Sequence, residues 1–194
     1  MVKLIGPNKV KTAVFISGTG SNLKNLIKFS LKKDSPIVIE YVFSNNKKAK
    51  GIIFSKKLNI KTKTLNFSKQ NSIEKKILFD LNKKNIKLIC LAGFMKILSK
   101  NFIKKFDGRI LNIHPSLLPK YKGLNTHKRV LKNKEKFSGC TVHFVNDKLD
   151  AGKIILQKKV KINRNDTYQS LKKKILKQEH ILYPKAIRKI IFNL

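Results

Sequence analysis

An amide and an imidazole stand two residues apart in the apolar, strand-like run 109–114, where Asn112 and His114 occur. Side chains at positions i and i+2 point to the same side of a strand, so both groups would face one pocket. Pro115 and Pro119 stiffen the segment that follows, because proline fixes its own φ and restricts the preceding residue. The pattern favours transfer chemistry at a carbonyl group with His114 as the acid–base residue. The alternative is a strand end whose histidine only satisfies the core.

A third candidate, Asp150, lies in the turn-like sequence Lys-Leu-Asp-Ala-Gly between two strand-like runs. An aspartate before Ala-Gly can simply form the turn. If the turn folds back over His114, the carboxylate would raise the pKa of the imidazole and favour its protonated form near neutral pH. Of the other histidines, we expect His143 on a strand and His180 on the last helix. For His127 we favour loop packing, with a place in the lining of the same pocket as the alternative.

The sequence Gly-Thr-Gly-Ser-Asn at residues 18–22 joins a strand to an amphipathic run. Glycines let backbone N–H groups approach an anion, and a helix start adds unpaired N–H groups and a positive dipole. The segment is not a dinucleotide fingerprint, because Leu23 occupies the third glycine position, and no Gly-Lys-Ser/Thr follows as in a P-loop. It predicts a site for a phosphate-sized anion. A tight turn with an N-cap is the alternative.

Strand-like and helical runs alternate along most of the chain. Strands are expected at residues 12–17, 37–44, 61–65, 86–91 and 109–113, and helices at 23–31, 49–58, 72–82 and 99–106. This order predicts an α/β, Rossmann-like, mostly parallel sheet flanked by helices, with ligands beyond the carboxyl ends of the strands. Residues 138–145 and 154–162 predict a C-terminal antiparallel strand pair. A terminal helix follows, capped by Asp166 or Thr167 and bent at Pro184.

Composition is consistent with one globular domain, which we expect to span residues 1–194. No apolar run reaches the roughly 18 residues that cross a bilayer, and the N-terminus lacks the features of a signal peptide. Cys90 and Cys140 sit singly in apolar runs, typical of core residues. No cluster has metal-ligand spacing. We therefore expect a cytoplasmic location, no metal and no membrane partner.

The formal net charge of +35 raises the question of a nucleic-acid partner. Four of the 45 basic residues are arginines, although recognition of bases and phosphates favours arginine. The lysines are spread from end to end, and Asn and Ile are also abundant, as an AT-rich coding sequence would produce. We therefore expect no specific nucleic-acid partner, although salt-sensitive adhesion to polyanions follows from the charge.

Five segments, in order, resemble the phosphoribosylglycinamide formyltransferase family, a group of formyltetrahydrofolate-dependent formyltransferases. They are ISGTGSNL at 16–23, LAGFMKIL at 91–98, LNIHPSLLPKYKG at 111–123, GCTVHFV at 139–145 and LDAG at 149–152. The run Asn-x-His-Pro-Ser-Leu-Leu-Pro with the later Leu-Asp is highly specific for these transferases. The resemblance covers nearly the whole chain.

The resemblance implies transfer of the formyl group of 10-formyltetrahydrofolate, a co-substrate, to the amine of 5-phosphoribosylglycinamide in de novo purine biosynthesis. It implies that Asn112 holds the formyl oxygen, His114 shuttles protons and Asp150 tunes the histidine. The implied phosphoribosylglycinamide-binding residues are Gly20, Ser21 and Asn22 at the phosphate and Glu179 at the ribose. The implied folate-binding residues are Met95, Lys96, Ile97, Leu98, Asn112, Asn146, Asp147, Lys148, Leu149 and Asp150.

Three positions depart from the family pattern. Thr19 stands where Asn is common between the two glycines, which is harmless if backbone N–H groups bind the anion. Gln70 stands near the place of a basic residue at the folate tail, and Lys69 is the possible substitute. Ala151 replaces a common glycine, which is tolerated unless this residue needs a positive φ.

Other functions remain as alternatives. A methionyl-tRNA formyltransferase normally carries a further C-terminal domain, and a formyltetrahydrofolate deformylase an N-terminal regulatory domain. A nucleic-acid-binding module predicts arginine and aromatic residues clustered on one face. A nicotinamide oxidoreductase needs an acidic residue after the second strand, where Ser44 and Asn45 stand. We expect small-molecule substrates and a monomer or homodimer.

Overall fold

The computed structural model describes residues 9–192, and within them the strands form one seven-stranded sheet of order β3-β2-β1-β4-β5-β6-β7. Residues 1–8, which include the segment considered as a signal peptide, and residues 193–194 lie outside the described part. The strands are β1 (Val10–Ile16), β2 (Ile37–Ser44), β3 (Lys61–Thr64), β4 (Leu88–Leu91), β5 (Arg109–His114), β6 (Phe137–Phe144) and β7 (Ile154–Lys161).

The helices connect the strands and close the chain. They are α1 (Ser21–Ser30), α2 (Gly51–Lys57), α3 (Gln70–Lys83), α4 (Lys100–Lys105), α5 (Thr126–Lys132) and α6 (Tyr168–Phe192), with a 3-10 turn, η1 (Phe67–Lys69), before α3. Every strand and helix expected from the sequence is present, with ends that differ by a few residues. The Thr167 hydroxyl caps α6, because it accepts from the N–H of Ser170 at 3.2 Å, and the helix continues through Pro184.

Helix α5 and the turn η1 were not expected. In α5 only Thr126, His127 and Val130 are buried, so this short helix lacks the long apolar stripe by which a helix is predicted. It follows Asn125, whose φ of 57° is the left-handed conformation that asparagine tolerates. The expectation of loop packing for His127 is therefore wrong, since this residue lies on a helix and packs edge-on against the ring of Tyr168.

The first five strands are parallel, β6 runs opposite to them, and β7 returns to their direction. β1 pairs with β2 on one side and β4 on the other, whereas β6 runs antiparallel to β5, and β7 antiparallel to β6. The fold class expected from the sequence, including the C-terminal antiparallel pair, is confirmed. Because the strand order turns around at β1, the segments after β1 and β4 flank a crevice at the carboxyl edge of the sheet.

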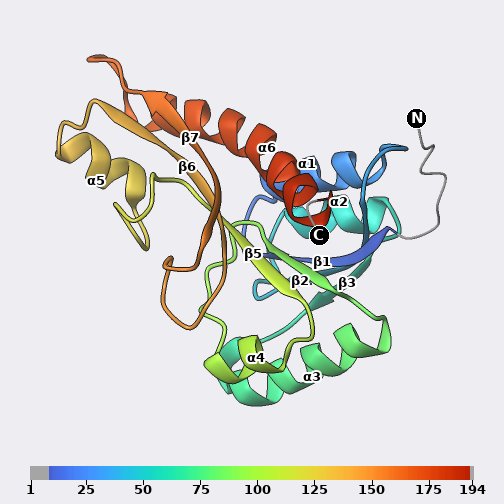
Figure 1. Cartoon of the computed structure of the whole chain (residues 1–194). Coiled ribbons are helices and arrows are strands. Elements are labelled where there is room, and N and C mark those ends of the chain that lie inside the picture. Colours follow the sequence, from blue (N-terminus) through green and yellow to red (C-terminus); the bar gives the residue numbers. More distant parts are fainter. Residues whose placement is uncertain (1–8, 193–194) are drawn as a thin grey trace.

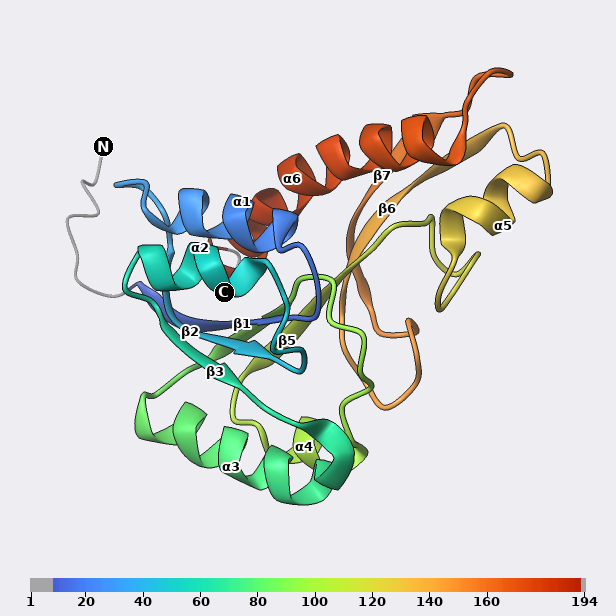
Figure 2. The ribbon, with the colours of Figure 1, turned by 180° about the vertical axis from the view of Figure 1, so that it is seen from behind.

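Helices cover both faces of the sheet and divide its core in two. Helices α1, α2 and α6 lie on one face, and α3 and α4 on the other (Figures 1 and 2). Alternate residues of β1 serve the two faces: Val14 and Ile16 belong to the first core, and Ala13 and Phe15 to the second. Because β1 is buried on both faces, its end is held rigidly, and so are the polar groups that follow it at the carboxyl edge of the sheet.

Both edge strands of the sheet carry lysines. β3 carries Lys61 and Lys63, and β7 carries Lys158, Lys159 and Lys161 along its exposed length. Among residues 9–192, no helix combines the length and apolar character that crossing a bilayer requires.

Candidate active site

The turn before β7 brings Asp150 to the end of β5. One carboxylate oxygen of Asp150 lies 3.3 Å from Nδ1 of His114, and the other accepts from the Asn112 amide at 3.3 Å. His114 and Asp150 are buried, and Asn112 is half-buried. The structure therefore brings together the three groups that the sequence places in distant segments. This arrangement can hold a proton and a polarised carbonyl oxygen side by side.

Two backbone features fix the position of Asp150. The residue itself has a φ of 46°, and its carboxylate accepts the N–H of Gly123 at 2.8 Å. At Gly152 the chain passes so close to β6 that an added Cβ would lie 1.7 Å from the carbonyl oxygen of Phe144. Ala151 is not among the described residues with a positive φ, so alanine fits where the family commonly has glycine.

Both ring nitrogens of His114 are engaged within the protein. Nε2 lies 2.9 Å from the carbonyl oxygen of Tyr121, which can only accept, so Nε2 carries a proton. Nδ1 faces Asp150. Tyr121 has a φ of 59°, an uncommon conformation for a bulky residue, and this aims its carbonyl group at the ring.

Burial, rather than the neighbouring carboxylate, dominates the pKa of His114. Desolvation lowers this pKa by more than the Tyr121 carbonyl and Asp150 raise it, so it lies below the ordinary value of 6.5. The expectation of a raised pKa therefore has the wrong sign, because the sequence reveals the carboxylate but not the depth of the ring. For Asp150, burial raises the pKa, but His143, the Gly123 N–H and His114 together hold it below its ordinary value. Asp150 is thus ionised at neutral pH.

His143 joins the cluster, a contact that the sequence did not predict. It is the cross-strand partner of Asn112 between β5 and β6. Its Nδ1 lies 2.8 Å from the Phe144 carbonyl oxygen and therefore carries a proton, and its Nε2 lies 3.2 Å from the Asn112 amide nitrogen and 3.7 Å from a carboxylate oxygen of Asp150. Both protons of the Asn112 amide are thus directed at protein partners. Placing the run 137–144 beside β5 would have revealed this neighbour.

In the turn between β1 and α1, no side chain caps the backbone N–H groups at the start of the helix. Gly20 has a φ of 76°, and an added Cβ would lie 2.5 Å from the Cα of Gly51, so only glycine fits. No side chain caps α1, and its first turn has no acidic residue. The N–H groups of Ser21 and Asn22 therefore stand at the positive end of the helix dipole, where an anion would be stabilised.

Glu179 approaches this turn from α6. Its carboxylate accepts from the Asn22 amide at 2.7 Å, and both side chains are buried. Burial raises the pKa of Glu179, and the single hydrogen bond from Asn22 only partly opposes that shift. The amide oxygen of Asn22 is buried without a hydrogen-bond partner in the described structure. The Glu179 carboxylate and the unpaired amide oxygen of Asn22 thus lie beside the uncapped backbone N–H groups of α1.

The segment 95–98 is tied to the same edge. The N–H of Met95 donates to the hydroxyl of Ser17 at 2.7 Å, which in turn donates to Asn45 at 2.5 Å. Met95 and Ile97 expose most of their side chains, whereas Leu98 is packed in the core. Of the expected folate-binding residues, the side chain of Leu98 therefore does not reach the surface.

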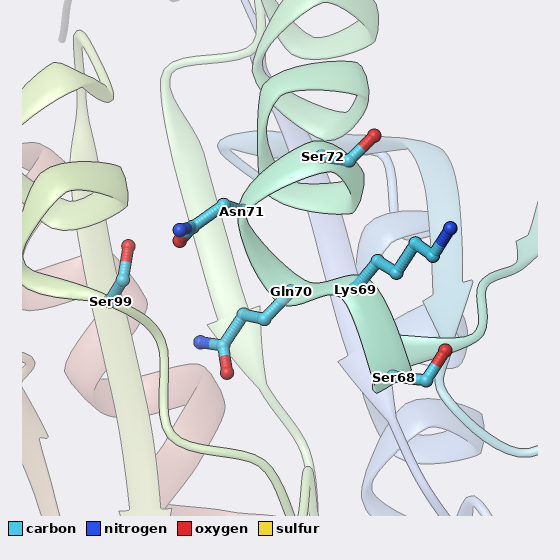
Figure 3. Close-up of a pocket in the computed structure, with 6 residues that line it drawn as sticks. All are labelled: Ser68, Lys69, Gln70, Asn71, Ser72 and Ser99. Carbon is cyan, nitrogen blue, oxygen red and sulfur yellow. The ribbon is translucent and has the colours of Figure 1, made fainter.

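A polar network holds this segment against α3. The amide of Gln70 donates to Glu74 and to the carbonyl oxygen of Ile97, both at 2.8 Å, while Glu74 accepts the N–H of Ser99 at 2.9 Å. Figure 3 shows Gln70 directed towards the Ser99 side and Lys69 extending the other way. Gln70 thus holds the segment, and its amide protons are not free for a ligand carboxylate.

The other expected folate-lining turn is exposed. Asn146, Asp147, Lys148 and Leu149 lie at the surface before the buried Asp150, and Asp147 approaches Lys100 at 3.7 Å. In the described part of the chain, no group of three or more His, Cys, Asp or Glu residues has the arrangement of a metal site.

Comparison with known proteins agrees with this geometry. The family model described as formyl transferase matches residues 10–187. Phosphoribosylglycinamide formyltransferase of Haemophilus influenzae is 41% identical over 92% of this chain and 85% of its own length. The crystal structure of phosphoribosylglycinamide formyltransferase from Brucella melitensis superimposes with a TM-score of 0.88 at 40% identity, covering 94% of this chain and 95% of that one.

Longer relatives contain the same unit. The trifunctional purine biosynthetic protein adenosine-3 of Gallus gallus is 42% identical over 95% of this chain, which spans 19% of that protein. This chain spans 14% to 19% of the length of the trifunctional relatives that it matches. With a family match over most of the chain and a single-unit relative at 41% identity, the chain belongs to the formyl transferase family and, within it, to the phosphoribosylglycinamide formyltransferases.

Proposed function

We propose that this protein transfers the formyl group of 10-formyltetrahydrofolate to the amine of 5-phosphoribosylglycinamide, a step of de novo purine biosynthesis. The observation that carries the proposal is the convergence of Asn112, His114 and Asp150 at one edge of the sheet, 3.3 Å apart at their closest contacts. Membership of the formyl transferase family supports the same reaction.

The reaction joins the substrate nitrogen to the formyl carbon and breaks the bond from that carbon to N10 of the folate. A proton leaves the amine, and N10 gains one. We propose that Asn112 donates to the formyl oxygen as negative charge develops and that His114 carries the proton. Such oxyanion stabilisation and positioned proton transfer each contribute roughly 10²–10⁴-fold. Asp150, ionised and against Nδ1, would stabilise the imidazolium that forms.

These roles require exchange of hydrogen-bond partners. The Asn112 amide directs one proton at His143 and the other at Asp150, and His114 holds Tyr121 and Asp150. The contacts of Asp150 with the amide and the ring are the longest of these, at 3.3 Å each. We propose that the formyl oxygen replaces Asp150 at the Asn112 amide and so receives an amide proton, while Asp150 remains beside Nδ1 as the ring takes up the transferred proton.

We propose that the N–H groups at Gly20, Ser21 and Asn22 bind the substrate phosphate and that Glu179 accepts ribose hydroxyls. The folate would lie against residues 95–98, Asn112 and residues 146–150. Gln70 donates its amide protons to Glu74 and to the carbonyl oxygen of Ile97, so we propose no hydrogen bond from Gln70 to the carboxylate of the folate tail.

We further propose one formyltransferase domain over residues 1–194, a cytoplasmic location, and a monomer or homodimer that acts on small molecules. Cell fractionation with an antibody to the chain tests the location. Sedimentation of the purified protein tests the oligomeric state.

The decisive experiment measures turnover of 10-formyltetrahydrofolate with 5-phosphoribosylglycinamide, and separately with initiator methionyl-tRNA. We expect formylated glycinamide ribonucleotide and tetrahydrofolate in equal amounts, with no formylated tRNA. Formyl transfer to tRNA alone would overturn the proposal in favour of a tRNA enzyme. Release of formate without an acceptor would favour a deformylase.

A further inference from the structure

The segment that follows β5 is fixed to β6 and β7 by side-chain hydrogen bonds. The buried hydroxyl of Thr141 on β6 donates to the carbonyl oxygen of Ser116 at 2.7 Å and accepts the N–H of Leu118 at 3.1 Å. The amide of Gln157 on β7 donates to the carbonyl oxygen of Leu118 at 2.8 Å. The chain is therefore held in place up to the residues just before Tyr121.

Tyr121 continues this segment in an uncommon conformation. Its φ of 59° lies in the left-handed region, which a bulky residue occupies only when its surroundings determine it. Its hydroxyl donates to Glu135 at 2.9 Å and accepts from the Asn133 amide at 2.9 Å, and the Arg129 guanidinium lies over the ring, 5.3 Å from its centroid. Helix α5 and the residues after it thus supply the groups that hold this side chain.

Packing alone does not hold the Tyr121 ring. The side chain is half-buried and lines a cavity of about 240 Å³ between its own segment, α5 and the paired strands β6 and β7. A ring beside a hollow can move once its hydroxyl is released, because no neighbour fills the space on that side. Hydrogen bonds from Tyr121 and Lys120 lower the pKa of Glu135, so the acceptor of the hydroxyl is ionised at neutral pH. A charge-assisted hydrogen bond is therefore the contact on which the position of Tyr121 depends.

The backbone carbonyl of Tyr121 contacts His114. Both ring nitrogens of this histidine face acceptors: Nε2 lies 2.9 Å from the Tyr121 carbonyl oxygen, and Nδ1 lies 3.3 Å from the Asp150 carboxylate. A neutral imidazole carries one proton, so the two acceptors compete for it. The shorter contact places this proton on Nε2, which leaves the lone pair of Nδ1 to receive another.

We propose that Tyr121 is a positioning residue for formyl transfer: held by Glu135, it keeps its carbonyl oxygen on Nε2 of His114 and so keeps Nδ1 unprotonated for the proton that leaves the substrate amine. Tyr121 acts through His114 and not on the substrate. With the proton on Nδ1 instead, the ring would present a donor where a base is needed. The effect on turnover rests on the proposed function, whereas the position of the proton does not.

The pH profile of turnover reports this contact. Burial lowers the pKa of His114, and the Tyr121 carbonyl is the largest influence that opposes it. Four other titratable or charged side chains surround the ring, and all remain in Tyr121→Phe: Asp150, His143, Arg129 and His127. Loosening the Tyr121 carbonyl therefore lowers the pKa of His114 further, and the acid limb of kcat moves to lower pH.

NMR of the ring nitrogens in the ¹⁵N-labelled full chain tests the position of the proton, with His114→Ala to identify the signals. In the parent we expect the neutral form of His114 to be protonated on Nε2. In Tyr121→Phe, which loses only the hydroxyl, we expect a mixture of both tautomers. A proton on Nδ1 in the parent, or an unchanged tautomer in the variant, would overturn the proposal.

Matched variants test the route through Glu135. Tyr121→Phe and Glu135→Ala should each lower kcat about tenfold with little change in KM, a smaller loss than an ångström-scale displacement of a reacting group causes. Because both changes remove one and the same hydrogen bond, the double variant should be no slower than either single variant. Glu135→Gln keeps an acceptor for the hydroxyl and should retain kcat. Lys120→Met removes only the other partner of Glu135 and is the control.

The outcomes separate this role of Tyr121 from the proposed function. A parent without formyl transfer would sink the proposed function, and the tautomer would still show whether Tyr121 holds the proton. With an active parent, three results would overturn the role: normal kcat in Tyr121→Phe, losses that add in the double variant, or a slower enzyme whose acid limb and tautomer are unmoved. Thermal unfolding checks each variant, and Tyr121→Phe alone decides the matter if Glu135→Ala does not fold.

Discussion

The first turn of α1 and the cluster around His114 stand at the same edge of the sheet, but they use their hydrogen-bonding groups differently. At α1 no side chain caps the backbone donors and the first turn itself contains no acidic residue, so an anion can bind without displacing a cap. Around His114 every ring nitrogen, and both protons of the Asn112 amide, already face a protein group. One region is thus arranged for binding, whereas the other must give up contacts before it can react.

Removal of the imidazole should have the largest effect. We expect His114→Ala to lower kcat at least about 10²-fold with little change in the KM for phosphoribosylglycinamide, because the donors at α1 are untouched. Steady-state kinetics with circular dichroism as a check on folding measures this. Near-normal turnover would remove His114 from the mechanism.

The position of Asp150 can be disturbed without touching its carboxylate. Gly152→Ala would force a Cβ against the Phe144 carbonyl oxygen, so the turn must shift and carry Asp150 away from the ring. We expect a loss in kcat of roughly 10–10²-fold, as for an ångström-scale misplacement. Ala151→Gly, one residue earlier and without a positive φ, is the control and should retain activity. Equal effects of the two changes would contradict this account.

At the turn before α1, the matched variants are Gly20→Ala, which should disturb the turn, and Gly18→Ala, which is its control. Gly20 has a positive φ and touches Gly51, whereas nothing lies within 4 Å of a Cβ added at Gly18. We expect Gly20→Ala to cost about 1–3 kcal/mol of stability and to raise the KM for phosphoribosylglycinamide while affecting kcat less. Thermal unfolding and substrate titration measure both quantities. A large fall in kcat at unchanged KM would show that the two regions are not separable.

The smallest effect should come from Glu179→Gln. The raised pKa of Glu179 means that the folded protein binds its proton more tightly than the unfolded chain does, so this stability is present below the ordinary value of 4.5 and lost as pH rises through the folded pKa. At neutral pH the variant should therefore be more stable by about 1 kcal/mol, since the new amide can also donate to the open oxygen of Asn22.

Melting temperatures at acidic and neutral pH test this sign, and the KM for phosphoribosylglycinamide should rise. A variant that is less stable than the parent at neutral pH would show that the ionised Glu179 carboxylate is stabilised, not destabilised, by its surroundings.

The sequence was sufficient for the order of strands and helices along the chain and for placing His114 at the end of a parallel strand, where ligands bind. The residue pattern left the meeting of His114 with Asp150 conditional, and only the family resemblance implied it, because Asp150 follows an antiparallel strand and reaches His114 where its turn folds back. The sequence was not sufficient for His143 or Tyr121. The first depends on the antiparallel pairing of β6 with β5, and the second on a left-handed backbone at a tyrosine.

Burial explains the remaining differences. The sign of the shift at His114 depends on how deeply the ring lies, which no local pattern gives. The helix α5 has too few apolar residues to be recognised by periodicity, and it forms where Val130 and His127 can pack against the rest of the chain. The role of Gln70 likewise depends on a carbonyl group 27 residues away.

The lysines on β3 and β7 give the high charge a consequence for solubility and assembly. These strands end the sheet on either side, and an unpaired strand edge is a template on which a second chain can add. Copies that approach edge to edge would bring rows of ammonium groups together before any backbone hydrogen bond could form. Cationic margins of this kind keep neighbouring molecules from joining into continuous sheets, a protection that high salt would weaken by screening.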